Sequence, residues 1–85
     1  MKKQDIPKWF EGLVYNEGDK VRNSFSGKEY ELNSIELSMY DFIMGSQILM
    51  EMSPQAVTPK ITKDVQKAID WFKENNLEAF QVLLD

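Results

Sequence analysis

The sequence predicts an α+β fold, with a small N-terminal antiparallel β-meander followed by a long central helix and two C-terminal helices. Three observations predict it. Residues 1–33 are rich in β-prone residues and turn signals, residues 34–53 carry apolar side chains at helical spacing, and residues 59–85 do so again after a proline linker at 54–58. Because 85 residues suffice for one domain and are too few for two, we expect residues 1–85 to form a single domain.

Three short segments of the β-rich part have the composition of strands. Leu13–Tyr15 and Lys20–Asn23 are β-prone and are separated by a turn at 16–19. Lys28–Leu32 alternates polar and apolar residues and follows a second turn at Ser24–Gly27, where the glycine can take a positive φ. Strands this short are marginally stable alone, so we expect a helix to pack on the meander.

The central helix is predicted to begin with a capping box. Asn33 and Glu36 have the spacing at which the Asn33 side chain accepts from the third helical amide while the Glu36 side chain reaches back to the Asn33 amide. Ser53-Pro54 should end this helix, because the residue before a proline disfavours helical backbone.

The central helix is apolar on two opposite faces when it is drawn at about 100° per residue. One face carries Ile35, Met39, Phe42, Ile43, Leu49 and Met50. The opposite face carries Leu37, Tyr40, Met44, Ile48 and Met52. A helix with two apolar faces must be covered on both. We expect the β-meander on one face, and the C-terminal helices, a second copy of the chain or another partner on the other.

The C-terminal part contains signals for two helices. Thr58 is a suitable N-cap with Pro59 at the first helical position. Apolar residues then recur at helical spacing as far as Phe72, and the pair Asn75-Asn76 interrupts the pattern. Asn75 and Glu78 repeat the capping-box spacing, which predicts Asn75 as the N-cap of the last helix.

The composition argues against an enzyme. The chain has no histidine and no cysteine, which removes the commonest general base, the commonest metal ligand, thiolate metal sites and disulfides. The carboxylates in the helical part fit a solvated acidic face, formed by Asp41, Glu51, Asp64, Asp70, Glu74 and Glu78. We therefore expect no catalytic residues, no cofactor, no metal and no small-molecule substrate.

The net charge of −4 is unevenly distributed along the chain. Residues 1–33 contain six basic and six acidic residues, whereas residues 34–85 contain four basic and eight acidic ones. Nucleic-acid binding needs a basic footprint, so nucleic acid is not the expected partner. One alternative is a single-strand stacking platform, since basic residues alternate with aromatic ones near the N-terminus; the basic residues are Lys2, Lys3, Lys8, Lys20, Arg22 and Lys28.

Neither a leader peptide nor a membrane span is expected. Asp5, Pro7 and Lys8 interrupt the N-terminal segment before any apolar run can form. The longest apolar segment, residues 39–52, contains several polar positions, among them Asp41. These patterns lead us to expect a cytoplasmic protein.

Two hypotheses about function follow from these features. The first is a non-enzymatic interaction protein that forms a homodimer or binds a protein partner through the second apolar face of the central helix. Its candidate residues are Leu37, Tyr40, Met44, Ile48 and Met52, together with Phe25 at the tip of the second turn. Methionine adapts to irregular surfaces and is common at interfaces, although it also fills cores. The alternative is an acidic modulator of a host enzyme or nucleic-acid-binding protein.

Several short runs carry a resemblance to a known group of proteins. They are Val21–Gly27, Glu31-Leu32, Tyr40–Gly45, Trp71-Phe72 and Ala79–Asp85. Together they resemble short uncharacterised proteins of tailed bacteriophages, including marine T4-like phages and sequences from marine metagenomes. In that pattern a proline follows the turn asparagine, where this chain has Ser24. The resemblance implies a phage or marine-metagenome setting, so the expected cytoplasm would be that of the infected or host bacterial cell, and it implies no activity or cofactor.

Overall fold

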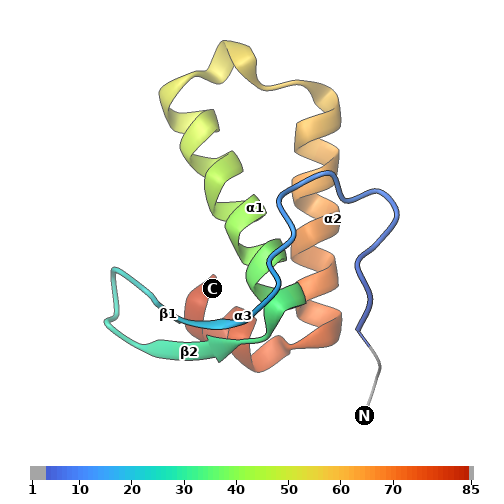
Figure 1. The fold of residues 1–85 in the computed structure, drawn as a ribbon. Helices are drawn as coiled ribbons and strands as arrows, with labels where there is room; N and C mark the ends of the chain where they lie inside the picture. Colours follow the sequence, from blue (N-terminus) through green and yellow to red (C-terminus); the bar gives the residue numbers. More distant parts are fainter. Residues whose placement is uncertain (1–3, 85) are drawn as a thin grey trace.

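A two-stranded antiparallel sheet precedes three α-helices in the computed structural model, which describes residues 4–84 (Figure 1). This arrangement confirms the predicted α+β class. The elements are β1 (Asp19–Arg22), β2 (Glu29–Leu32), α1 (Ser34–Met52), a turn of 3-10 helix η1 (Pro54–Ala56), α2 (Pro59–Asn75) and α3 (Leu77–Leu83).

The predicted meander is a single hairpin, because Leu13–Tyr15 forms no strand. β1 pairs with β2 alone, with Val21 opposite Tyr30. The Tyr15 amide instead donates a hydrogen bond of 2.9 Å to the Ser38 hydroxyl on α1. The N-terminal segment therefore satisfies its backbone against a helix and crosses in front of α1 and α2 (Figure 1).

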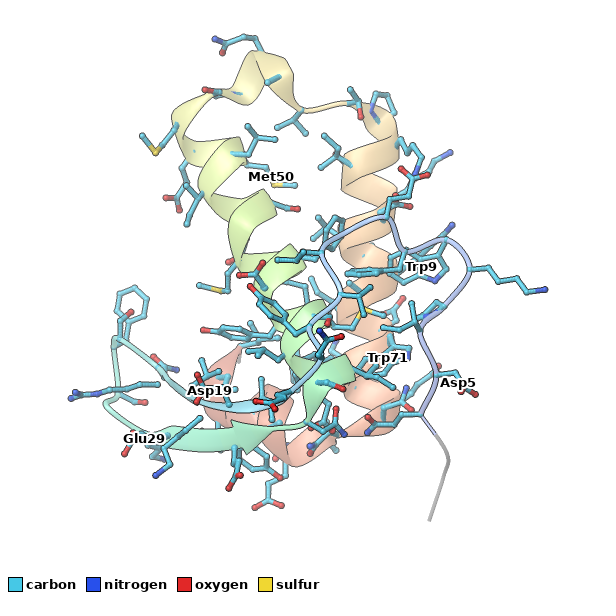
Figure 2. All side chains as sticks on the ribbon, viewed as in Figure 1. Asp5, Trp9, Asp19, Glu29, Met50 and Trp71 are labelled. Atoms are coloured by element: carbon cyan, nitrogen blue, oxygen red, sulfur yellow. The ribbon has the colours of Figure 1, made fainter. Side chains whose placement is uncertain are left out.

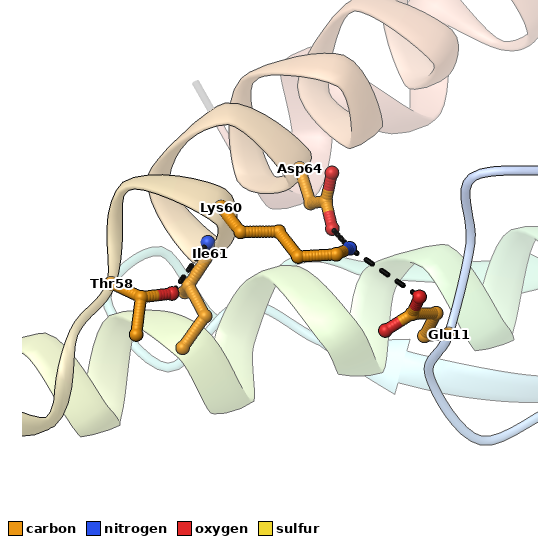
Figure 3. A network of polar contacts seen from close by, with 5 residues as sticks. All are labelled: Glu11, Thr58, Lys60, Ile61 and Asp64. Carbon is orange, nitrogen blue, oxygen red and sulfur yellow. Dashed lines mark hydrogen bonds and ion pairs between the residues drawn. The ribbon is translucent and has the colours of Figure 1, made fainter.

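The helix caps follow the predicted signals with one exception. The Asn33 side chain accepts from the Glu36 amide at 2.8 Å, and the Glu36 carboxylate accepts from the Asn33 amide at 3.1 Å, so the capping box is confirmed. Thr58 caps α2 by accepting from the Ile61 amide at 3.2 Å (Figure 3).

The N-cap of α3 is Asn76, and the prediction of Asn75 was wrong. The Asn76 side chain accepts from the Ala79 amide at 3.1 Å. Asn75 is the last residue of α2, and its side-chain amide donates to the Trp71 carbonyl at 2.8 Å. Asn76 is thus both the C-cap residue of α2 and the N-cap residue of α3.

The core lies where α1 and α2 run side by side in opposite directions and the hairpin and α3 close one end (Figure 1). Figure 2 shows Met50 pointing from α1 towards α2. Burying the large apolar side chains supplies most of the driving force for folding, at roughly 25 cal/mol per Å² of apolar surface. The buried apolar residues are Phe10, Leu32, Met39, Ile43, Val65, Ala68, Phe72, Ala79 and Leu83.

Glu36 connects the N-terminal segment, α1 and the α2–α3 junction. Its side chain is buried, with only 5% of the residue exposed. Besides the cap, its carboxylate accepts from the Gln4 side-chain amide at 2.8 Å and from the Asn76 side-chain amide at 2.9 Å. No lysine or arginine within residues 4–84 forms an ion pair with it, so only neutral hydrogen-bond donors satisfy this buried carboxylate.

Asp64 also differs from the expectation of a solvated acidic face, because it is buried. Its carboxylate lies 2.7 Å from the Lys60 ammonium, which also lies 3.5 Å from the Glu11 carboxylate (Figure 3). The hydrogen bond that Lys60 donates to Asp64 raises the pKa of Lys60 above its ordinary value, and the negative charges of Asp64 and Glu11 act in the same direction. This network joins the N-terminal segment to α2.

None of the helices within residues 4–84 has both the length and the apolar character needed to cross a bilayer.

Candidate protein-interaction surface

The two apolar faces of α1 have different surroundings. On the first face, Met39 and Ile43 are completely buried. On the second face, Leu37, Tyr40 and Met44 are half-buried, and Leu37 and Tyr40 pack against the core. The same face is uncovered towards the C-terminal end of the helix, where Ile48 is 53% exposed and Met52 78% exposed. The chain therefore covers only the N-terminal half of the second face.

The expected packing of the hairpin on α1 needs a correction. β2 lies mainly against α3 and only slightly against α1, while α2 is the principal neighbour of α1. The hairpin turn projects beside α1 instead of covering it (Figure 1).

Phe25 lies at the tip of the hairpin turn and is completely exposed. The turn beneath it is held by Asn23, whose side-chain oxygen accepts from the Phe25 amide at 2.8 Å and the Ser26 amide at 3.3 Å. The Asn23 side-chain amide donates to the Val82 carbonyl of α3 at 3.0 Å. Gly27 has φ +77°, as predicted, and its amide donates to the Asn23 carbonyl at 2.8 Å. The aromatic ring is thus presented on an ordered turn that is anchored to α3.

A groove of about 220 Å³ separates this turn from α1 and the end of α3. It contains Phe25, Tyr40 and Met44 from the sequence-predicted interaction residues, and these three come from two distant segments of the chain. Leu37, Ile48 and Met52 do not line it. The complete lining is Arg22, Asn23, Ser24, Phe25, Tyr40, Met44, Gln47, Leu83 and Leu84.

The groove and the uncovered half of α1 form one continuous surface, since Met44 belongs to the groove and Ile48 follows it one helical turn later. We define the α1–hairpin face by its six apolar members: Phe25, Tyr40, Met44, Ile48, Met52 and Leu84. Its charged residues are Arg22, in the groove lining, and Glu51, one turn beyond Gln47 on α1. Both are exposed, and neither forms an ion pair with another described residue.

Tyr40 contributes a neutral phenol to this face. Partial burial raises the pKa of Tyr40 above its ordinary value of 10.0, so the ring carries no charge at neutral pH. Its hydroxyl can both donate and accept a hydrogen bond at the edge of the face.

Sequence reasoning missed Arg22, Gln47 and Leu84 as members of the surface. The helical spacing of Gln47 from Met44 offered a weak signal. Leu84 follows α3 and reaches the groove only because α3 folds back beneath the hairpin, and no local pattern encodes that.

The basic and aromatic residues of the N-terminal part are not gathered into one platform. Lys2 and Lys3 lie outside the described residues. Trp9 is half-buried, with the Lys67 ammonium 5.9 Å from its ring centroid, and it lies near α2 on the opposite side of α1 from the hairpin turn (Figures 1 and 2).

Comparison of the chain with protein-family models, with curated proteins and with solved structures gave no match. The class that the fold defines is a small α+β protein in which a β-hairpin precedes three helices within residues 4–84.

Proposed function

We propose that this chain is a non-enzymatic interaction protein that binds another protein chain through the α1–hairpin face. We further propose, on the resemblance of its short motifs to phage proteins, that it acts in the cytoplasm of an infected bacterial cell. The observation that carries the first proposal is the completely exposed Phe25 ring on a hydrogen-bonded turn.

An aromatic side chain on a rigid backbone is typical of the interface residues that contribute most of the binding free energy. Aromatic side chains bury a large area on binding and lose little conformational entropy when their backbone is already fixed. The Asn23 hydrogen bonds fix the backbone beneath Phe25 before any partner arrives. Single exposed apolar residues are common on proteins, but Phe25 adjoins a groove and a helix stripe of the same character.

The groove lining favours binding over acid–base chemistry. Its one charged group is the Arg22 guanidinium, which cannot act as a general base at neutral pH. The Tyr40 phenol is protonated at neutral pH, since burial raises its pKa further above the ordinary value of 10.0. The remaining lining is apolar or neutral, which suits an apolar protein surface.

The test is site-specific photo-crosslinking in the cell that naturally makes the chain. A benzophenone amino acid replaces Phe25 in one variant and Leu77 in a control, because Leu77 is an exposed apolar residue (52% exposed) at the start of α3, outside the groove. We expect a discrete crosslinked species from position 25 and not from position 77. Adding Ile48→Lys to the position-25 variant should abolish that species, because it disrupts the α1–hairpin face whichever protein chain is the partner. Equal products from both positions, or none from position 25, would refute the proposal.

A further inference from the structure

We propose that the occupant of the α1–hairpin face is a second copy of this chain, related by a twofold axis that sets the two α1 helices antiparallel. This inference rests on the proposed function, since it names the partner of the same surface. It is carried by three properties of the face: the spacing of its apolar residues, the position of the hairpin turn and the placement of its charges.

The apolar ridge on α1 is complementary to itself. Tyr40, Met44, Ile48 and Met52 follow one another at intervals of four residues, which forms the kind of ridge that packs against another helix. A rotation of the ridge by a twofold axis that passes between Met44 and Ile48, perpendicular to α1, superimposes the ridge on itself in the opposite direction. Tyr40 then faces Met52 of the second copy, and Met44 faces Ile48. The half-covered end of each ridge thus meets the uncovered end of the other.

The hairpin turn supplies the missing cover. Phe25 lines the groove at the level of Tyr40 and Met44 of its own chain. In the antiparallel pair, Ile48 and Met52 of the second copy lie at that level. Each Phe25 ring therefore packs on the exposed end of the opposite α1, and each groove receives part of that helix. A twofold interface of this kind uses the same patch on both subunits, as its symmetry requires.

The charges on the face are complementary in the same arrangement. Arg22 lies in the groove lining, and Glu51 follows Gln47 of that lining one helical turn later, so both lie on the hairpin side of the ridge. The pairing brings Arg22 of each copy to the end of α1 that bears Glu51 of the other. Two equivalent ion pairs form, one at each end of the interface.

The size of the face predicts a weak dimer. Stable interfaces bury about 800 Å² and 20–30 residues on each partner. The α1–hairpin face has six apolar members and a few polar neighbours, which is fewer than a stable interface uses. We therefore expect a dissociation constant in the micromolar range and a dimer that exchanges readily.

The experiment is a charge-exchange series followed by sedimentation velocity, over protein concentrations from about 1 µM to 1 mM, the range in which small interfaces associate. Arg22→Glu and Glu51→Arg alone should each weaken the dimer severalfold, because every dimer then contains two like-charge contacts. An equimolar mixture of the two variants should associate at nearly the wild-type affinity. A heterodimer of one variant with the other restores both ion pairs, which a different partner or a different symmetry would not produce.

Ile48→Lys with the matched control Leu77→Lys completes the test. Both positions are about half-exposed, so both variants should fold. Ile48→Lys should abolish association, and Leu77→Lys should leave it unchanged. A chain of 9.9 kDa that remains monomeric throughout the range, or a mixture no tighter than the separate variants, would overturn the inference. If the monomer result accompanies a position-25 crosslink to a different protein in cells, the proposed function stands and only its second-copy partner is wrong.

Discussion

Removing the Glu36 carboxylate should destabilise the fold strongly, although Glu36 belongs to no ion pair in the described structure. The carboxylate accepts hydrogen bonds from the Asn33 amide and from the side chains of Gln4 and Asn76. Hydrogen bonds to charged groups contribute about 1.5–3 kcal/mol each, and donors that remain accessible recover part of this from water. Since Asn33 is exposed and Gln4 half-buried, we expect Glu36→Ala to cost about 2–4 kcal/mol in total.

That loss is large for a protein of 85 residues, whose free energy of unfolding is on the order of 4–13 kcal/mol. Glu36→Gln should cost less, about 1–2 kcal/mol, because the amide keeps the shape and one acceptor but turns a donor towards the other donors. Urea unfolding followed by circular dichroism measures both variants. All proteins should be compared at one concentration, because association stabilises the folded chain.

The control for this prediction is Glu74→Gln, a change of the same type at an exposed position near the end of α2. It should alter the free energy of unfolding by no more than about 0.5 kcal/mol. A Glu36→Ala protein as stable as that control would show that the buried carboxylate does not hold the N-terminal segment to the helices.

Three further predictions concern other parts of the chain. Gly45→Ala should stabilise the fold by about 0.5–1 kcal/mol in urea unfolding, because the added methyl group meets no atom and alanine favours the helix interior; lower stability would contradict this. Gly18→Ala should destabilise the fold, because the new Cβ would overlap the Leu32 carbonyl oxygen, and an unchanged urea-unfolding midpoint would show that the loop shifts freely. In a pH series, stability should fall as the pH rises above 10.0, since burial favours the protonated Tyr40 phenol in the folded chain and the raised pKa of Lys60 acts in the same direction; Tyr40→Phe should reduce that fall.

Local signals were sufficient to predict much of the fold. The Asn33–Glu36 capping box, the Thr58-Pro59 start of α2 and the positive φ of Gly27 each depend on a few adjacent residues, and the structure has all three. Helical spacing likewise predicted the extent of α1. Interactions that close within one helical turn or one tight turn can be inferred without knowing the rest of the chain.

The failures involve residues whose partners are far away in the sequence. Leu13–Tyr15 has the composition of a strand, but a strand needs a neighbouring edge, and this segment meets Ser38 of α1 instead. Asp64 was assigned to a solvated acidic face but is buried, and the Lys60 ammonium that pairs with it also lies near Glu11 of the N-terminal segment. The position of α3 beneath the hairpin could not be predicted from local sequence patterns either.

The candidate surface shows the same division. The second apolar stripe of α1 and the exposed tip at Phe25 were predictable from periodicity and turn chemistry. Their meeting around one groove was not, because it depends on the Asn23 side chain bonding to the Val82 carbonyl of α3. This long-range hydrogen bond is one of the contacts that hold the hairpin turn to α3.

Hydroxyl-radical footprinting at increasing protein concentration tests directly whether side chains on the helix ridge and the turn tip become covered together. Phe25 and Met52 should lose reactivity as the concentration rises, whereas Leu13 and Leu77, which are comparably accessible apolar residues elsewhere, should keep theirs. Unchanged reactivity at Phe25 and Met52, or an equal loss at all four positions, would contradict the account.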